Sequence, residues 1–336
     1  MKILWLYKYF ANFNTDHWLH MDFARYINKI NGLKLRAYGP GLELDYSDIV
    51  PVRYHEDITM EQLYKKFKFD VVILNTKSRM FHNYFPCLHP YNFDKIEINT
   101  GMWLPKDFDS FNCPKIMIDE DYHYELNDDW YYDRGIKLII QRHRPHSLVG
   151  GKVKKVWHPF SVDINTFKPN PRIIRKNTVH FIGSISEPYI YRKMAAGILK
   201  SHGYLPDYCP RTKTIDSNYI KALQAYTAYL SGASIYNIAP AKMFEVMASE
   251  GILITNAPLD ADAVNYGLFE LFPADSLITF DHVCGSDLIE KVDRIIKDEG
   301  FRNYTVKNAL KAITGNHTHE IRINQIINTI KKEFNI

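Results

Sequence analysis

The sequence predicts an α/β protein with two doubly wound, Rossmann-like domains facing a cleft. Short apolar runs alternate with segments of helical periodicity along most of the 336 residues. A proline-rich connector at residues 158–172 divides this alternation into two series. Because ligands of such folds bind at the carboxyl ends of parallel strands, we expect the site where the two domains face each other.

The first series begins with an apolar strand at residues 2–7. A helix is expected at residues 16–30, where apolar residues recur every three or four positions. Residues 69–75 form a near-continuous apolar run, which is typical of a strand buried on both faces of a parallel sheet. Further strands are expected at residues 115–119, 137–141 and 154–158.

The second series repeats this pattern after the connector. Its expected strands are residues 178–183, 235–238, 252–255 and 276–280. Its expected helices are residues 191–201, 221–230, a segment ending at Gly251, residues 288–297 and most of residues 303–334. We therefore predict an N-terminal domain, a linker, a second domain and a C-terminal helix returning to the first domain, at residues 1–160, 161–176, 177–315 and 316–336.

Composition excludes several classes of protein. No apolar run approaches the roughly 18–20 residues of a membrane span. The four cysteines lie far apart and form no C-x-x-C pair, which argues against a zinc site or a disulfide framework and favours a cytoplasmic location. The net charge is only +4, but it is unevenly distributed.

Residues 94–133 hold 11 acidic and 3 basic residues, whereas residues 134–180 hold 11 basic residues and one acid. Either these two stretches neutralise each other, or the second forms a basic wall beside a cleft for an anionic ligand. Arg142 and Arg144 lie in this basic stretch and are candidates for acceptor binding.

Four stretches in order resemble a known family. They are the linker with Ser161, Val162, Asp163, Phe167 and Pro169; the strand and helix with Gly183 and Arg192; residues 241–258; and the helix with His317, Thr318 and Arg322. Together they resemble the group 1 glycosyltransferases of the GT-B fold, and most closely the CgeB-like, spore-maturation branch. The resemblance covers roughly residues 154–330.

The resemblance implies a nucleotide-sugar donor site at the front of the helix that begins near Pro240. A leaving diphosphate needs cations and backbone N–H groups, and a helix N-terminus supplies both partial positive charge and N–H donors. Lys242 lies in that first turn, and Glu245 follows one turn later with a carboxylate suited to ribose hydroxyls. The competing interpretation is an ordinary i,i+3 surface pair.

Further donor contacts are expected after the strand that ends at Gly183. Gly183 and Ser184 allow close backbone approach to a ligand, and Arg192 can bind phosphate oxygens with two N–H groups, with Lys193 as the fallback. Asn237 stands where the wider group 1 pattern has a glutamate, so it can bind a hydroxyl but carries no charge.

Acceptor-side candidates lie at the ends of the N-terminal strands. Asp121 or His123 could accept the proton of the acceptor hydroxyl, and Asp16 with His17 could contact the acceptor. The D-x-D pattern at residues 119–121 suits a divalent metal, but we discount it because it belongs to single-domain transferases. No metal site is expected.

The sequence therefore predicts a hexosyl- or pentosyltransferase that moves a sugar from a nucleotide sugar, with a UDP-sugar favoured, to an acceptor hydroxyl. The family resemblance implies retention of configuration without metal or other cofactor. The acceptor could be hydroxymethylated phage DNA, whose backbone suits the basic stretch, or a surface or spore glycan. The alternatives are a nucleotide- or DNA-binding module without catalysis and a sugar-nucleotide epimerase of similar layout.

Overall fold

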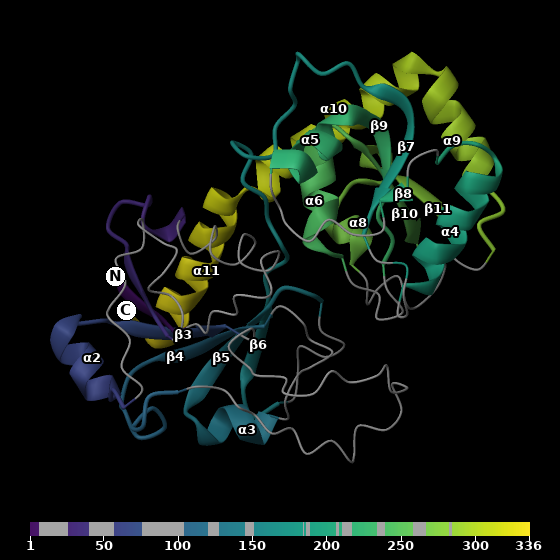
Figure 1. Cartoon of the computed structure of the whole chain (residues 1–336). Coiled ribbons are helices and arrows are strands. Elements are labelled where there is room, and N and C mark those ends of the chain that lie inside the picture. The colour runs from purple at the N-terminus through teal and green to yellow at the C-terminus, as the bar shows by residue number, and fades with distance from the viewer. Residues whose placement is uncertain are drawn as a thin grey trace. The chain divides into compact units, whose positions relative to one another are not determined.

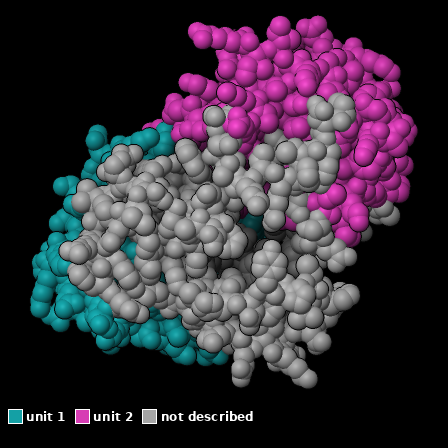
Figure 2. All heavy atoms as spheres, in the orientation of Figure 1, with its two compact units in different colours: residues 1–158, 323–336 teal, residues 159–322 magenta. Residues whose placement is uncertain are grey.

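The computed structural model describes residues 1–6, 26–39, 57–75, 104–119, 128–144, 151–183, 185, 189–205, 208–209, 217–233, 239–257, 267–281 and 284–336. The chain forms two compact units, drawn in teal and magenta in Figure 2. Unit 1 comprises residues 1–158 and 323–336, and unit 2 comprises residues 159–322. Each unit holds a parallel sheet with helices, which confirms the predicted fold class.

The sheet of unit 1 has the strand order β2-β1-β3-β4-β5-β6, and its pairs are parallel. The strands are β1 (Lys2–Leu6), β2 (Lys34–Tyr38), β3 (Val71–Asn75), β4 (Lys115–Asp119), β5 (Ile136–Gln141) and β6 (Lys154–Trp157). The helices α2 (Met60–Lys66) and α3 (Asp128–Asp133) belong to the same unit. From β1 the chain adds β2 on one side of the sheet and then β3 to β6 on the other side, as in other doubly wound sheets.

Alternating side chains of β1 enter two different hydrophobic clusters. Ile3 and Trp5 pack in one cluster, and Leu4 and Leu6 pack in the other. Because successive strand side chains point to opposite faces, the two clusters cover the two faces of the sheet. The first cluster also holds four isoleucines from the last helix of the chain, α11 (His319–Phe334), namely Ile323, Ile326, Ile327 and Ile330.

The sheet of unit 2 has the strand order β11-β10-β9-β7-β8. The strands are β7 (Lys176–Ile182), β8 (Tyr208–Cys209), β9 (Tyr226–Leu230), β10 (Ile252–Ala257) and β11 (Ile278–Asp281). The helices are α4 (Ile190–Ser201), α5 (Ser217–Ala225), α6 (Ala241–Ala248), α8 (Leu268–Leu271), α9 (Leu288–Lys297) and α10 (Glu299–Asn316), with a 3-10 turn at Ala274–Ser276. Figure 1 shows α4 and α9 on one side of this sheet and α5 and α6 on the other.

The helix predicted over residues 221–230 is wrong in its second half. Helix α5 ends at Ala225, and the next residue, Tyr226, begins β9 without an intervening loop. The segment YTAYL is rich in residues that favour strands, and most of it is buried between its neighbours β7 and β10. The strand predicted at residues 235–238 and most of the helix predicted at residues 16–30 lie outside the described residues.

Candidate functional site

Gly183 follows the carboxyl end of β7 and has a backbone φ of +152°, a conformation that favours glycine. A Cβ atom at this position would lie 3.2 Å from both Arg192 Nη1 and Lys242 Nζ. Two cationic groups, one from α4 and one from α6, therefore meet beside Gly183, where any larger residue would crowd them. The predicted donor residues Gly183, Arg192 and Lys242 are brought together by the fold.

Arg192 is buried and held from two sides. Its Nη2 donates a 2.8 Å hydrogen bond to the carbonyl oxygen of Gly232, which follows β9. Its guanidinium also lies 4.2 Å from the centre of the Tyr189 ring, close enough for a cation–π interaction. The guanidinium is thus fixed at the carboxyl ends of β7 and β9, where a doubly wound sheet binds its ligands.

Lys242 is half-buried in the first turn of α6. Burial, aided by the charge of Arg192 and opposed by Glu245, lowers the pKa of the Lys242 ammonium to about 8. Two neighbouring cations that each lose solvation are costly unless an anion offsets their repulsion. The pair therefore favours binding of a negatively charged group.

The N-terminus of α6 adds to this positive region. Pro240 is the N-cap residue and has an extended backbone, and no side chain caps the helix. The first N–H groups of a helix have no acceptor within the helix, and its dipole favours an anion at this end. The segment AKMFEVMA contains good helix formers, and almost all of its side chains are buried.

Glu245 is 3% exposed, so it is not part of a surface ion pair. The hydroxyl of Tyr219, on α5, donates a hydrogen bond to Glu245 Oε2. Burial raises the pKa of Glu245, while the Tyr219 hydrogen bond and the charge of Lys242 act in the opposite direction. The sequence did not indicate Tyr219, because it lies 26 residues before Glu245 on another helix.

The side chain of Asn256 provides a second polar group close to Arg192. Asn256, near the end of β10, is 0% exposed, and a Cβ atom at Gly232 would lie 2.7 Å from its Oδ1. Within the described residues, neither the amide oxygen nor the amide nitrogen of Asn256 has a hydrogen-bond partner, and Ser231 Oγ also lacks one. Unpaired buried polar atoms are rare in proteins, so Asn256 and Ser231 are unusual features of this edge of the sheet.

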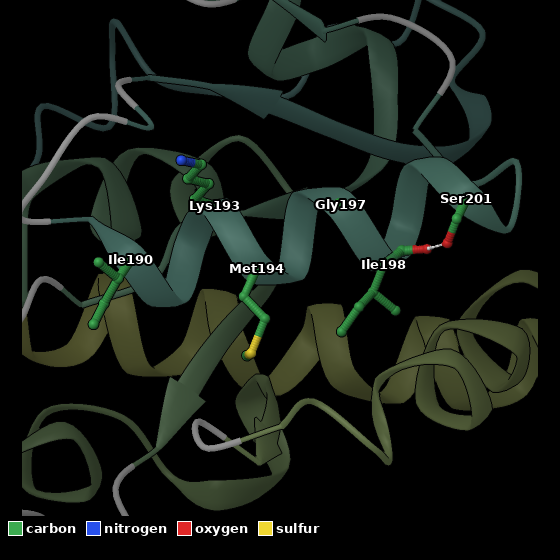
Figure 3. Close-up of a pocket in the computed structure, with 6 residues that line it drawn as sticks. All are labelled: Ile190, Lys193, Met194, Gly197, Ile198 and Ser201. Carbon is green, nitrogen blue, oxygen red and sulfur yellow. Dashed lines mark hydrogen bonds between the residues drawn. The ribbon is translucent and has the colours of Figure 1, made fainter.

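Lys193 lies apart from this group. Its side chain is exposed and lines a hollow of about 550 Å³ on the outer side of α4, together with Ile190, Met194 and Ile198. Figure 3 shows Lys193 extending away from Met194 on this helix. The fallback contact predicted from the sequence is therefore not grouped with Arg192 and Lys242.

Several predicted site residues lie outside the described residues: Asp16, His17, Asp121, His123, Ser184 and Asn237. Two acceptor-side candidates of unit 1 are described. Arg142 is buried, with its Nη1 3.4 Å from the carbonyl oxygen of His158, to which it donates. The guanidinium of Arg144 lies 5.6 Å from the centre of the Trp157 ring.

Many cations of the basic stretch have partners within their own unit. In unit 1, Lys152 pairs with Asp129, and Lys155 Nζ lies 3.1 Å from Asp128 Oδ1. In unit 2, Arg175 donates to backbone carbonyl oxygens. Lys152 and Lys155 thus pair with acids of the neighbouring acidic stretch, as the first interpretation expects, whereas Arg175 binds backbone carbonyl oxygens.

Neither a metal centre nor a membrane span is found in the part of the chain that the structure describes. Its histidine, cysteine and acidic side chains form no group of three that could hold a metal ion. None of its helices is both long enough and apolar enough to cross a bilayer.

Comparison with known proteins gives independent information on the family and the fold. Residues 195–328 match the model of a family described as glycosyl transferase-like. This match contains α6 with Lys242 and Glu245, and it includes most of unit 2. A search of curated proteins finds no significant match to the sequence.

Solved structures resemble the chain over nearly its whole length. A glycosyltransferase from Rickettsia africae ESF-5 has a TM-score of 0.65 at 14% identity, with 98% of both chains covered. An alpha-glucosyltransferase in complex with UDP and a 13-mer DNA containing an A:G mismatch has a TM-score of 0.62 at 13% identity, with 98% of this chain and 100% of that one covered. HepE from Anabaena in complex with UDP-glucose has a TM-score of 0.60 at 12% identity, with 99% and 100% covered. The chain therefore has the two-domain GT-B fold seen in these structures, and its residues 195–328 resemble the glycosyl transferase-like family.

Proposed function

We propose that this protein transfers a sugar from a nucleotide sugar to an acceptor hydroxyl, with a UDP-sugar as donor. The observation that carries this proposal is the convergence of Arg192 and Lys242 on Gly183, beside the N-terminus of α6. The UDP and UDP-glucose present in structures of the same fold favour this donor class.

The described residues divide into two roles in this proposal. Arg192 and Lys242 bind the diphosphate, because their charges and the first N–H groups of α6 match a doubly charged group. Glu245 accepts a hydrogen bond from a ribose hydroxyl, since a buried carboxylate needs donors to offset its lost hydration.

Negative charge develops on the diphosphate as its bond to the sugar breaks. Fixed cations stabilise that charge more than they stabilise the uncharged sugar, so they lower the barrier for departure. We propose a metal-independent, retaining reaction, in which Arg192 has this catalytic role. Asp121 or His123 would accept the proton of the acceptor hydroxyl, while Ser184, Asn237 and the other sequence-predicted contacts stay predictions.

The acceptor is a second part of the proposal. Phage DNA carrying a hydroxymethylated base is supported as acceptor by the DNA present with the alpha-glucosyltransferase of this fold. A surface or spore glycan is supported by the CgeB-like pattern at His317, Thr318 and Arg322.

Release of free UDP from UDP-sugars tests the proposal directly. We expect R192A and E245A to lower kcat/KM by about 10²-fold or more, as removal of other preorganised charge contacts does. Lys200→Ala, on the exposed side of α4, is the matched control and should retain wild-type turnover. Wild-type turnover in R192A or E245A would overturn the assignment of the site.

The alternative of a nucleotide-binding module without catalysis rests on Asn237, which replaces a carboxylate of the wider pattern. In that case the protein would bind UDP but would release none from any UDP-sugar. A screen of nucleotide sugars by thermal shift, followed by the release assay, separates the two functions.

A further inference from the structure

We propose that Tyr219 is a positioning residue that holds the Glu245 carboxylate as the acceptor for a ribose hydroxyl of the donor. This inference rests on the proposed function, because it assigns Glu245 to the nucleoside part of the ligand. It goes further by naming a residue on a different helix that controls how Glu245 meets that ligand.

Tyr219 reaches Glu245 from α5, and its side chain is well packed. It is 3% exposed, and its hydroxyl donates to Glu245 Oε2. Its ring packs edge-on against Phe167, with 6.3 Å between ring centres. A tyrosine fixed in this way presents its O–H in one direction, so it determines the orientation of the carboxylate that accepts from it.

The same ring also touches the diphosphate side of the site. Lys242 Nζ lies 5.8 Å from the centre of the Tyr219 ring, within the range of a cation–π interaction. Tyr219 thereby contacts the cation through its ring and the carboxylate through its hydroxyl. One side chain therefore contacts both the group expected to bind phosphate and the group expected to bind ribose.

The hydrogen bond has a clear chemical effect on Glu245. Burial favours the protonated carboxyl group, which would offer a donor in place of an acceptor. The Tyr219 hydroxyl favours the ionised form, because its O–H donates to the carboxylate. Among the described residues, Oε2 has this partner and Oε1 has none, so Oε1 is left for a ligand hydroxyl.

The test compares binding of two probes, UDP and inorganic pyrophosphate, to the full chain by calorimetry. Tyr219→Phe removes only the hydroxyl, and Glu245→Gln removes the charge. We expect each variant to weaken UDP binding about tenfold or more, which is typical for a lost hydrogen bond to a charged group. Tyr219→Phe should bind pyrophosphate within about twofold of the wild type, because Arg192, Lys242 and the charge of Glu245 are all retained.

Tyr229→Phe is the matched control. Tyr229 is also buried in unit 2, and its hydroxyl donates 2.6 Å to the carbonyl oxygen of Ala222 and not to the carboxylate of Glu245. This variant loses a buried hydroxyl of the same kind and should bind UDP like the wild type. A general loss of packing would affect both tyrosine variants alike.

UDP affinity measured over a range of pH separates a positioning role of Tyr219 from a merely structural one, because loss of packing alone would not shift the pH dependence. The part of the fall in UDP affinity at low pH that E245Q lacks reports protonation of Glu245, and loss of the Tyr219 hydroxyl should move it to higher pH. The Y219F/E245Q double variant should bind UDP no more weakly than E245Q alone, because Tyr219 acts through Glu245.

Four results would overturn the inference: equal behaviour of Y219F and Y229F, an equal loss of pyrophosphate binding in Y219F, an unmoved fall in UDP affinity at low pH, or additive losses in the double variant. Failure of the proposed function has a different signature. If the wild type binds UDP and Y219F behaves as expected but no UDP-sugar is turned over, the transferase proposal fails and the role of Tyr219 stands. A wild type that binds no UDP refutes both.

Discussion

The guanidinium of Arg192 joins the ends of two strands, because its Nη2 donates 2.8 Å to the carbonyl oxygen of Gly232 after β9 while its Nη1 lies beside Gly183 after β7. A single guanidinium thus contacts the backbone of the sheet with one nitrogen and places the other beside Gly183. The geometry depends on the planar fork of arginine, which offers several N–H donors in fixed directions.

Replacement by lysine tests this dependence. Lys carries one compact ammonium group, which cannot hold the Gly232 carbonyl and also reach the position of Nη1. We expect R192K to weaken UDP binding about tenfold although the charge is kept. Lys200→Arg, an exposed change on the same helix, is the control, and calorimetric titration with UDP measures both. Wild-type affinity in R192K would show that charge alone is sufficient.

A methyl group at Gly183 tests the close approach of the two cations. In G183A the new Cβ would lie 3.2 Å from Arg192 Nη1 and Lys242 Nζ, at a φ of +152° that L-residues rarely adopt. We expect UDP affinity to fall at least about tenfold and the free energy of unfolding to fall by about 1–3 kcal/mol.

The control for G183A is Gly197→Ala on α4. A Cβ atom at Gly197 meets no heavy atom within 4 Å. The alanine should therefore stabilise the helix by about 0.5–1 kcal/mol and leave UDP binding unchanged. Urea denaturation and UDP titration of the two variants give the comparison, and similar results at both positions would contradict the proposed crowding at Gly183.

The lowered pKa of Lys242 predicts how UDP affinity changes with pH. With a pKa of about 8 in the free protein, Lys242 loses its charge as pH rises through that value. A bound diphosphate favours the charged form and raises the pKa, so binding takes up a proton above about pH 8. We expect affinity to fall between about pH 7 and about pH 9, with proton uptake visible as a dependence of the binding enthalpy on the buffer.

Lys242→Arg is the matched variant for this prediction. Arginine stays charged throughout this pH range, so the affinity of K242R for UDP should stay nearly constant. The same decline in K242R and in the wild type would assign the pH dependence to another group.

His317 predicts an acid sensitivity of unit 2. Its Nε2–H donates 2.8 Å to the carbonyl oxygen of Leu271, and its Nδ1 accepts 2.9 Å from Arg322 Nη2. The ring also packs edge-on against Phe244 of α6, with 5.2 Å between ring centres. Burial, aided by the charge of Arg322 and opposed by the hydrogen bond to Leu271, lowers the pKa of His317 to about 4.

The sign of the effect follows from comparing the two states. An unfolded histidine titrates near pH 6.5, so between about pH 6.5 and about pH 4 the unfolded chain binds more protons than the folded one. Stability should therefore fall as pH falls through this window, by up to about 3 kcal/mol from this residue. His317→Gln should cost about 1–3 kcal/mol at neutral pH but flatten the acid decline. His202→Gln, at an exposed position, should leave the decline unchanged in denaturant unfolding series, and an equally steep decline in H317Q would contradict the assignment.

The strands could be predicted from the sequence where apolar runs have clear boundaries. The run at residues 115–119 coincides with β4, which is buried within its parallel sheet. The strand β9 was missed because α5 leads directly into it, with no glycine or proline between Ala225 and Tyr226. The strand β2, with the sequence KLRAY, was missed because charged residues interrupt its apolar pattern.

The candidate site could be predicted only where its residues lie close together in the sequence. Lys242 and Glu245 lie on one helix, so their shared position follows from a three-residue separation. Tyr219 and Gly232 lie on other elements, and only the packing of α5 and β9 brings them to Glu245 and Arg192. A single sequence contains no local signal for such contacts.

The last helix has a consequence for the order in which the protein can fold during synthesis. Ile323, Ile326, Ile327 and Ile330 belong to the same hydrophobic cluster as the first strand of the chain. Residues 159–322, which form unit 2, therefore leave the ribosome as a complete unit before unit 1 has received its final segment. The N-terminal unit is translated first but is completed last, and until then the nascent chain carries an apolar surface that a chaperone could bind.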